Sequence, residues 1–231
     1  MVTIVKICGL STPDTMAAAL DSGADMIGLV FFAKSPRYVD LKTARSLAEQ
    51  ARGRAAIAAL TVNADDATLT GIIAATRPDV LQLHGHETAE RIADIRLRFR
   101  RPVMKAVGIA SAEDVTAARD LAAALAAAGS QDRMLLDAKP PKDAALPGGN
   151  GLPFDRNLVA GLDLALPFMV SGGLDPASVA EAIRLVAPWG VDVSSGVERA
   201  PGVKDPARIE AFIRAARAAG VDGAETRGRV A

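Results

Sequence analysis

The sequence has a single cysteine, few aromatic residues and no net charge at neutral pH. Cys8 has no second cysteine to pair with, which excludes an intrachain disulfide and favours a cytoplasmic protein. Lysine plus arginine equals aspartate plus glutamate at 27 each, so a large basic surface for nucleic acid is not expected. No apolar run reaches the length of a membrane span, and strand-like sequence directly after Met1 does not resemble a signal peptide. The expected partner is therefore a small molecule, with neither nucleic acid nor membrane.

The motifs of several enzyme classes are also missing. The histidines, cysteine and aspartates form no cluster with metal-ligand spacing, and no nucleophile elbow supports a Ser-His-Asp arrangement. We therefore expect neither a metal site nor acyl-enzyme chemistry.

The chain alternates short β-branched runs with longer alanine-rich segments over 231 residues, half of them apolar. The predicted strands are Thr3–Ile7, Met26–Phe31, Ala56–Val62, Val80–Leu83, Val103–Val107, Met134–Asp137, Phe168–Val170 and Val191–Val193. The predicted helices are Thr12–Ser22, Leu41–Arg52, Asp65–Thr76, Glu87–Phe99, Ala112–Ala128, Asp155–Ala160, Pro176–Val186 and Asp205–Ala219. Regular alternation of strand and helix is typical of a parallel sheet.

Two folds fit this alternation, an open doubly wound sheet and a (β/α)8 TIM barrel. The first predicted strand is followed by Cys8-Gly9-Leu10 rather than by Gly-x-Gly-x-x-Gly, which argues against the doubly wound sheet. Barrels of about this length are common as single domains. We expect one barrel domain over residues 1–220, with residues 221–231 as a frayed tail that has lost the pattern.

Two strand ends carry glycines that suit a phosphate group. The run Gly190–Gly202, GVDVSSGVERAPG, passes from a strand through Ser194, Ser195 and Gly196 into one helical turn. Phe168–Leu174 likewise ends in Gly172 and Gly173 before a helix. Backbone N–H groups at such ends bind phosphate, and barrels frequently hold it after strands seven and eight. The long segments Phe32–Asp40 and Lys139–Phe154 follow strands on the same face and are expected to be binding loops or lids.

Cys8 and Asp137 are the candidate proton-transfer groups at strand ends. A lone cysteine can simply be a small apolar residue, but a second reactive group on the same face favours a chemical role. Asp137 is the only carboxylate in its run, and a charge at the end of a buried strand is rarely a packing choice.

Four other polar residues are candidates for the site, and three of them have two readings each. His84 in QLHG is either a core histidine or a site residue, and Asn63 follows a strand in the same way. Lys105 either points into the barrel or lies near the outer helices with its ammonium group in water, and we favour the first slightly. Arg37 is either a solvated loop residue or a residue whose guanidinium group binds a carboxylate with two hydrogen bonds.

The chain resembles the phosphoribosylanthranilate isomerases of tryptophan biosynthesis from about Val5 to Phe212. The motifs that carry the resemblance are Lys6-Ile7-Cys8-Gly9, Gly23-Ala24-Asp25 through Ser35-Pro36-Arg37, Val62-Asn63, Gln82-Leu83-His84-Gly85, Leu135-Leu136-Asp137, Gly148-Gly149, Phe154-Asp155, Gly172-Gly173-Leu174 and Gly190 through Glu198. The resemblance implies a (β/α)8 barrel that converts N-(5-phosphoribosyl)anthranilate into 1-(2-carboxyphenylamino)-1-deoxyribulose 5-phosphate. It implies no cofactor for this Amadori rearrangement.

The resemblance also implies roles for individual residues. Asp137 is implied as the general acid, which requires a raised pKa, and Cys8 as the general base, which requires a thiolate. Arg37 is implied to hold the anthranilate carboxylate. The glycine and serine residues of both strand ends, Gly172, Gly173, Ser194, Ser195 and Gly196, are implied to hold the phosphate.

The sequence departs from the family pattern at three positions. Asn150 stands where a threonine or serine is usual, Arg156 where a tryptophan is usual, and Ser171 where an alanine is common. Asn150 retains a polar side chain for loop closure, whereas Arg156 reaches either a ligand or an acidic neighbour.

Two other functions and two oligomeric states remain open at this stage. One alternative is another phosphosugar isomerase or epimerase barrel, and the other is a non-catalytic sensor of a phosphorylated ligand. A cysteine paired with an aspartate argues against the first alternative. The pattern of the related isomerase of histidine biosynthesis is a pair of aspartates at these strand ends. Two retained proton-transfer groups argue against the second. The sequence does not decide between a monomer and a homodimer.

Overall fold

The computed structural model describes residues 3–127, 131–141, 148, 151 and 153–227, with side chains described as far as Ala219. The strands of the central sheet are β1 (Ile4–Cys8), β2 (Met26–Val30), β3 (Ala56–Thr61), β4 (Val80–Leu83), β5 (Val103–Ile109), β6 (Arg133–Ala138), β7 (Phe168–Val170) and β8 (Gly190–Val193). They are parallel and close into a barrel, because β1 pairs with both β2 and β8. The predicted (β/α)8 barrel is confirmed.

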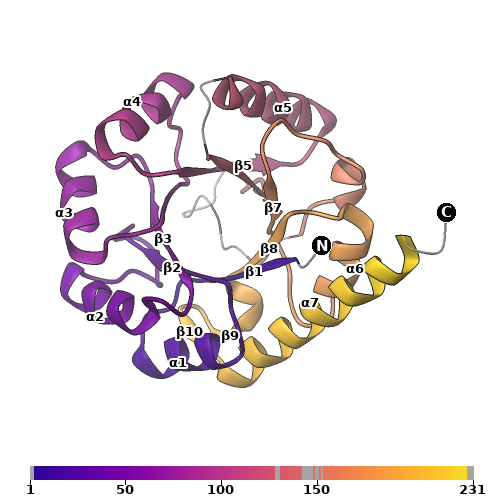
Figure 1. The fold of residues 1–231 in the computed structure, drawn as a ribbon, viewed down its shortest axis with the longest axis horizontal. Helices are drawn as coiled ribbons and strands as arrows, with labels where there is room; N and C mark the ends of the chain where they lie inside the picture. The colour runs from indigo at the N-terminus through magenta and orange to yellow at the C-terminus, as the bar shows by residue number, and fades with distance from the viewer. Residues whose placement is uncertain (1–2, 128–130, 142–147, 149–150, 152, 228–231) are drawn as a thin grey trace.

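The helices surround this barrel, as Figure 1 shows. They are α1 (Pro13–Asp21), α2 (Leu41–Ala51), α3 (Asp66–Thr76), α4 (Ala89–Phe99), α5 (Ala112–Ala126), α6 (Val179–Val186) and α7 (Pro206–Arg227), with the 3-10 helices η1 (Arg156–Val159) and η2 (Ser195–Val197). Side-chain oxygens of Thr12, Asp40 and Asp65 accept hydrogen bonds from N–H groups in the first turns of α1, α2 and α3. Such caps stabilise helix starts directly after loops. No helix in the described part of the chain is long and apolar enough to cross a membrane.

Two features at the C-terminal side differ from the prediction. An antiparallel hairpin of β9 (Glu198–Ala200) and β10 (Val203–Lys204) follows η2, and the sequence analysis missed it. Helix α7 continues to Arg227, beyond the predicted end at Ala219. The backbone of residues 221–227 is therefore helical, residues 228–231 lie outside the described residues, and the domain boundary at 220 stays a prediction.

Successive side chains along each strand point alternately into the barrel and toward the helices, so the apolar residues form two layers. One cluster joins side chains from different barrel strands, among them Met26, Ala58, Met104, Leu135 and Met169. Residues of the opposite parity pack with the surrounding helices in two larger clusters. This parity decides whether a polar strand residue faces the barrel interior or the helices.

Three aspartates fix the strand starts at the opposite end of the barrel from the site. Asp25, Asp79 and Asp132 each stand directly before a strand. Their carboxylates accept the N–H groups of Val5, Ile57 and Val103, at 2.7, 2.8 and 2.8 Å. Each aspartate therefore ties the start of one strand to the start of the preceding strand, which fixes the register of the sheet.

The fold predicts how α7 contributes to stability. Phe212 is fully buried on α7 within the cluster that joins this helix to the barrel, whereas Leu97 on α4 is 81% exposed. We expect Phe212→Ala to lower the free energy of unfolding by about 3–5 kcal/mol, because it leaves a cavity. Leu97→Ala is the matched control and should stay within about 0.5 kcal/mol of the parent chain. Urea denaturation of both variants measures this, and equal effects would contradict the docking of α7.

Candidate active site

A pocket lies at the carboxyl ends of the barrel strands. The residues that both the sequence analysis and the pocket lining share are Cys8, Arg37, His84, Asp137, Gly172, Gly173, Ser194 and Ser195. They come from the ends of β1, β4, β6, β7 and β8 and from the loop after β2. The fold therefore brings most of the predicted site together on one face, as expected for a barrel.

The Cys8 thiol occupies space that β2 leaves open. Cys8 pairs in register with Gly28, where an added Cβ would lie 2.7 Å from the sulfur atom. Any side chain at position 28 would therefore displace the thiol. Burial raises the pKa of Cys8 above its ordinary value, and the ammonium groups of Lys6 and Lys204 oppose that rise. The resting thiol is therefore protonated at neutral pH, and the two ammonium groups are positioned to stabilise a thiolate.

Lys6 lies beneath Cys8 on the inward face of β1 and is fully buried. Its Nζ donates to Oδ1 of Asp192 at 2.7 Å across the seam between β1 and β8. The other oxygen of Asp192 accepts from the Ser171 hydroxyl group at 3.2 Å. Burial alone would lower the pKa of Lys6, but the carboxylate of Asp192 holds it above its ordinary value, so this lysine stays charged.

Asp137 lies at the end of β6 beside His84. Its Oδ2 is 3.4 Å from Nε2 of His84, and its Oδ1 accepts the N–H group of Ala138 at 2.8 Å. Gly148 lies directly over both, because an added Cβ there would be 2.7 Å from Nε2 of His84 and 2.8 Å from Oδ2 of Asp137. Only a glycine allows the loop after β6 to cover these side chains so closely.

The loops after β7 and β8 form a cradle of backbone groups. Gly172 and Gly173 have positive φ angles of 76° and 61°, which other residues rarely adopt. Their N–H groups donate to no acceptor within the described part of the chain. Ser194 and Ser195 face the same pocket. Gly196 does not line it, but a Cβ there would clash with the carbonyl group of Leu174, so this glycine lets the two loops meet.

Arg156 supports this cradle from behind. Its Nη2 donates to the carbonyl oxygen of Gly172 at 3.1 Å, and its charge faces Glu181 and Asp175. The sequence predicted either a ligand or an acidic neighbour for Arg156. The structure places acidic residues near it, and its hydrogen bond goes to the backbone of the glycine loop.

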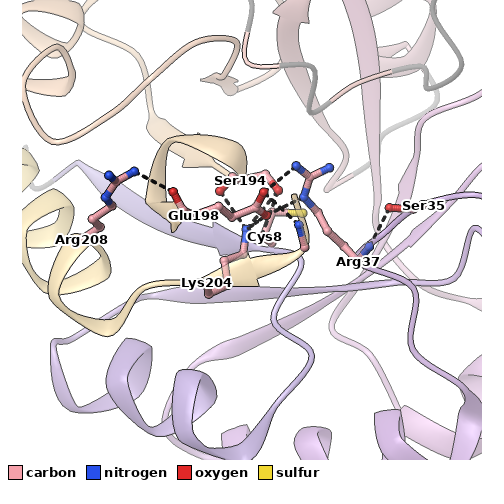
Figure 2. Close-up of polar contacts among 8 residues, drawn as sticks. Cys8, Ser35, Arg37, Ser194, Glu198, Lys204 and Arg208 are labelled. Atoms are coloured by element: carbon pink, nitrogen blue, oxygen red, sulfur yellow. Dashed lines mark hydrogen bonds and ion pairs between the residues drawn. The ribbon is translucent and has the colours of Figure 1, made fainter. Parts of the chain in front are cut away.

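Arg37 crosses from the loop after β2 to the C-terminal hairpin. Its stem lies on Gly9, where an added Cβ would be 2.7 Å from Cδ of Arg37. Its Nε and Nη2 donate to the two carboxylate oxygens of Glu198 at 2.7 and 2.9 Å. Figure 2 shows this pair, with Lys204 and Ser194 next to Glu198. Arg37 is only 5% exposed and lines the pocket, so it is not the solvated loop residue of the alternative reading.

Besides Gly196, Lys105 and Asn63 of the predicted set do not line the described pocket. Lys105 lies on the outward face of β5, toward the helices. Its Nζ donates to Oε2 of Glu87 at 2.7 Å and to the carbonyl oxygen of Gly85 at 2.6 Å. The favoured inward orientation was wrong, because Met104 and Ala106 fill the inward positions. Asn63 is exposed and accepts the N–H group of His86 at 2.7 Å, which joins two loops. Asn150 lies outside the described residues.

The sequence analysis missed the buried charges around the pocket. None of Lys6, Asp192, Glu198 and Lys204 is more than 6% exposed. Gln82 is fully buried, lines the pocket, and its amide group has no partner among the described residues. Charged residues within otherwise apolar strands were the available signal, because such residues are buried only when paired. No group of three or more side chains suited to a metal ion occurs in the described part of the chain.

Comparison with known proteins agrees with this geometry. The family model described as N-(5'-phosphoribosyl)anthranilate (PRA) isomerase matches residues 5–215. The chain belongs to this family. A relative of the same name from Rhodopseudomonas palustris (strain BisA53) is 58% identical over 214 residues, covering 93% of this chain and 95% of the relative. A relative from Bradyrhizobium diazoefficiens is 57% identical, with 94% and 95% covered.

Solved structures of the family have the same fold. Phosphoribosyl anthranilate isomerase from Thermotoga maritima superposes with a TM-score of 0.81 at 32% identity, covering 94% of this chain and 99% of that chain. A second family structure contains reduced 1-(o-carboxyphenylamino)-1-deoxyribulose 5-phosphate and superposes with a TM-score of 0.79 at 31% identity over the same shares.

The environment of Cys8 predicts how its reactivity depends on pH. Because burial raises the pKa of Cys8, the thiolate fraction should grow by about tenfold per pH unit below that pKa. Inactivation by iodoacetamide should therefore accelerate steadily from about pH 6 to about pH 9. Cys8→Ser is a clean control, since the chain has no other cysteine. A rate that is already constant below neutral pH would contradict this prediction.

Proposed function

We propose that this pocket catalyses the family's isomerisation of N-(5-phosphoribosyl)anthranilate, with Cys8 as general base and Asp137 as general acid. The observation that carries the proposal is one pocket lined by a thiol, a carboxylate, a guanidinium group and the glycine cradle. These four features match the needs of a ligand that has one carboxylate, one phosphate and a sugar between them. The reaction belongs to tryptophan biosynthesis, as the family does.

The reaction requires two proton transfers. Asp137 donates a proton to the ring oxygen of the ribose as its bond to C1 breaks, and the nitrogen lone pair forms the iminium ion. Cys8 then removes the proton from C2, and the electron pair of that C–H bond neutralises the iminium to give a 2-hydroxyenamine. This tautomerises to the ketone when its C2 hydroxyl group loses a proton and C1 gains one. Asp137 on β6 and Cys8 on β1 are separated by β7 and β8 in the barrel, so the sugar fits between acid and base.

The side chains around Cys8 support its role as base. Lys6 approaches from within β1 and Lys204 from β10, and both favour the thiolate, while Asp192 and burial favour the thiol. A raised pKa makes the thiolate scarce but strongly basic, which suits proton removal from carbon. His84 next to Asp137 is placed to orient the acid or to contact the sugar hydroxyl groups.

The two charged ends of the substrate have separate subsites. Gly172, Gly173, Ser194 and Ser195 hold the phosphate through backbone N–H groups and hydroxyl groups. Arg37 holds the anthranilate carboxylate on the β1–β2 side of the pocket. Lys105 and Asn63 take no part in this arrangement, and Asn150 retains only its predicted role in the loop.

Other properties of the protein stay predictions. A cytoplasmic location rests on the single cysteine, and the absence of a cofactor or metal rests on the chemistry of the reaction. A relative from Thermotoga maritima is described as dimeric, so a homodimer is one option beside a monomer. The two other functions, a different phosphosugar isomerase and a phosphate-ligand sensor, are outcomes of the experiments below.

Removal of either proton-transfer group should separate binding from turnover. Asp137→Asn keeps the shape of the side chain but cannot donate the proton, so kcat should fall by about 10² or more. Cys8→Ser should be impaired at least as much, because a serine hydroxyl group is too weak an acid to be present as the base. Loss of substrate fluorescence measures turnover, and calorimetry measures product binding, which should survive.

The outcomes of this experiment distinguish the candidate functions. Turnover close to wild type in either variant, measured on protein free of host isomerase, would overturn the assigned roles. An inactive parent chain that binds product tightly would favour the sensor. The double variant should lose little more than the worse single variant, because both groups act on one reaction.

The carboxylate subsite makes a prediction of its own. Arg37→Ala should raise the dissociation constant of anthranilate by about tenfold or more, because a bidentate charged contact is lost. Inorganic phosphate should bind as before, since its subsite lies on the other loops. Competitive inhibition by the two probes measures both constants. An equal loss for both probes would mean that Arg37 acts on the structure and not on the carboxylate.

A further inference from the structure

Glu198 is a buried carboxylate that the reaction does not use. It ends the SSGVE run and begins β9, and it is only 6% exposed. Its Oε1 accepts from Nε of Arg37 at 2.7 Å and from Nζ of Lys204 at 2.8 Å. Its Oε2 accepts from Nη2 of Arg37 at 2.9 Å and from the N–H group of Gly202 at 3.2 Å. Every strong acceptor position of this carboxylate is therefore occupied.

The contact between Glu198 and Arg37 uses one edge of the guanidinium group. Nε and Nη2 form that edge, and two parallel hydrogen bonds fix both its plane and its direction. The backbone behind Glu198 is fixed as well, because its carbonyl oxygen accepts from Nη1 of Arg208 at 2.6 Å. Figure 2 shows Glu198 between the two arginines. Arg37 is therefore held from the side of the C-terminal hairpin while it lines the pocket.

Lys204 balances the charge of Glu198. It is only 4% exposed, and its Nζ also donates to the carbonyl oxygen and the hydroxyl group of Ser194 at 2.8 and 3.2 Å. Burial alone would raise the pKa of Glu198, but Arg37 and Lys204 hold it below its ordinary value. The row Arg37, Glu198 and Lys204 carries two positive charges and one negative charge. Its net positive charge is thus available to an anionic ligand in the pocket.

We propose that Glu198 is a positioning residue that orients Arg37 for the carboxylate of the substrate, with Lys204 as the counter-ion that keeps this subsite positive. The inference rests on the proposed function, in which Arg37 binds the anthranilate carboxylate. It assigns to the β9–β10 hairpin a role in substrate recognition, although neither Glu198 nor Lys204 contacts the reacting atoms.

Two variants separate positioning from simple charge. Glu198→Gln removes the negative charge, so a model based on charge alone predicts tighter binding of anthranilate. Positioning predicts the opposite, because a glutamine offers one acceptor and turns its NH₂ group toward the guanidinium group. Lys204→Met keeps the two hydrogen bonds between Arg37 and Glu198 but removes one positive charge, so the group of three side chains becomes neutral. Both models then predict weaker binding of anthranilate. The sign of the effect in Glu198→Gln therefore decides between them.

The experiment measures inhibition constants of anthranilate and inorganic phosphate together with kcat and KM. In Glu198→Gln we expect the constant for anthranilate and the KM to rise by about tenfold, with phosphate binding within about twofold of the parent chain. In Lys204→Met we expect the constant for anthranilate to rise by at least about threefold. The matched control is Glu210→Gln on the exposed surface of α7, which should change nothing.

Several outcomes would overturn the proposal. Tighter or unchanged anthranilate binding in Glu198→Gln would remove the positioning role, and an equal loss of both probes would indicate a purely structural one. Unchanged anthranilate binding in Lys204→Met would remove the counter-ion role. If Glu198→Gln does not fold by circular dichroism, Glu198→Asp carries the test, since it keeps the charge and shifts the fork by one methylene group. It too should weaken anthranilate selectively.

Failure of this inference is distinguishable from failure of the proposed function. If Arg37→Ala weakens anthranilate binding but Glu198→Gln does not, the carboxylate subsite stands and only its positioning by Glu198 is wrong. If neither variant affects anthranilate, the carboxylate subsite itself is misassigned.

Discussion

The ion pair between Lys6 and Asp192 is the constraint on which the site depends. It lies inside the barrel at the seam where the first and last strands meet, with Nζ and Oδ1 2.7 Å apart. Loss of one partner would leave an unpaired buried charge, which typically costs about 3–5 kcal/mol. The pair therefore opposes any shift of β8 along β1. Because Cys8 ends β1 and Ser194 follows β8, the same pair also fixes the thiol relative to the glycine cradle.

The sequence predicted the barrel and the backbone part of the site because both have local signals. Strand alternation, helix caps and glycines before helices are all visible within a few residues. The buried charges are visible locally only as charged residues within apolar strands. Their pairing has no local signal, since Lys6 and Asp192 are distant in the chain and meet only when the barrel closes. Arg37 and Glu198 both lie in quoted motifs, but a role was predicted for Arg37 only. The parity of Lys105 could not be set, because a strand buried on both faces shows no polar side.

The two proposed anion subsites would bind their ligands by different interactions, and this difference explains where the buried charges lie. The phosphate cradle consists of N–H dipoles and hydroxyl groups, which carry no net charge and need no counter-ion. The carboxylate subsite uses a guanidinium group, and a buried guanidinium group needs an acidic partner. That partner is Glu198, which in turn is balanced by Lys204. The β9–β10 hairpin therefore supports the proposed carboxylate end of the pocket, and it also reaches the glycine cradle through the contact of Lys204 with Ser194.

The same balance of charges bears on the base. Lys6 is matched by Asp192 and Lys204 by Glu198, so neither ammonium group acts on Cys8 as an isolated charge. Burial can then dominate, and the pKa of the resting thiol lies above its ordinary value. Full exposure of the thiol to one unpaired ammonium group would give a more abundant thiolate, but a weaker base. Burial instead keeps the thiol protonated at rest, while the two paired lysines place positive charge where the thiolate forms. In the proposed reaction, the small thiolate fraction is then strongly basic, which suits the removal of a proton from carbon.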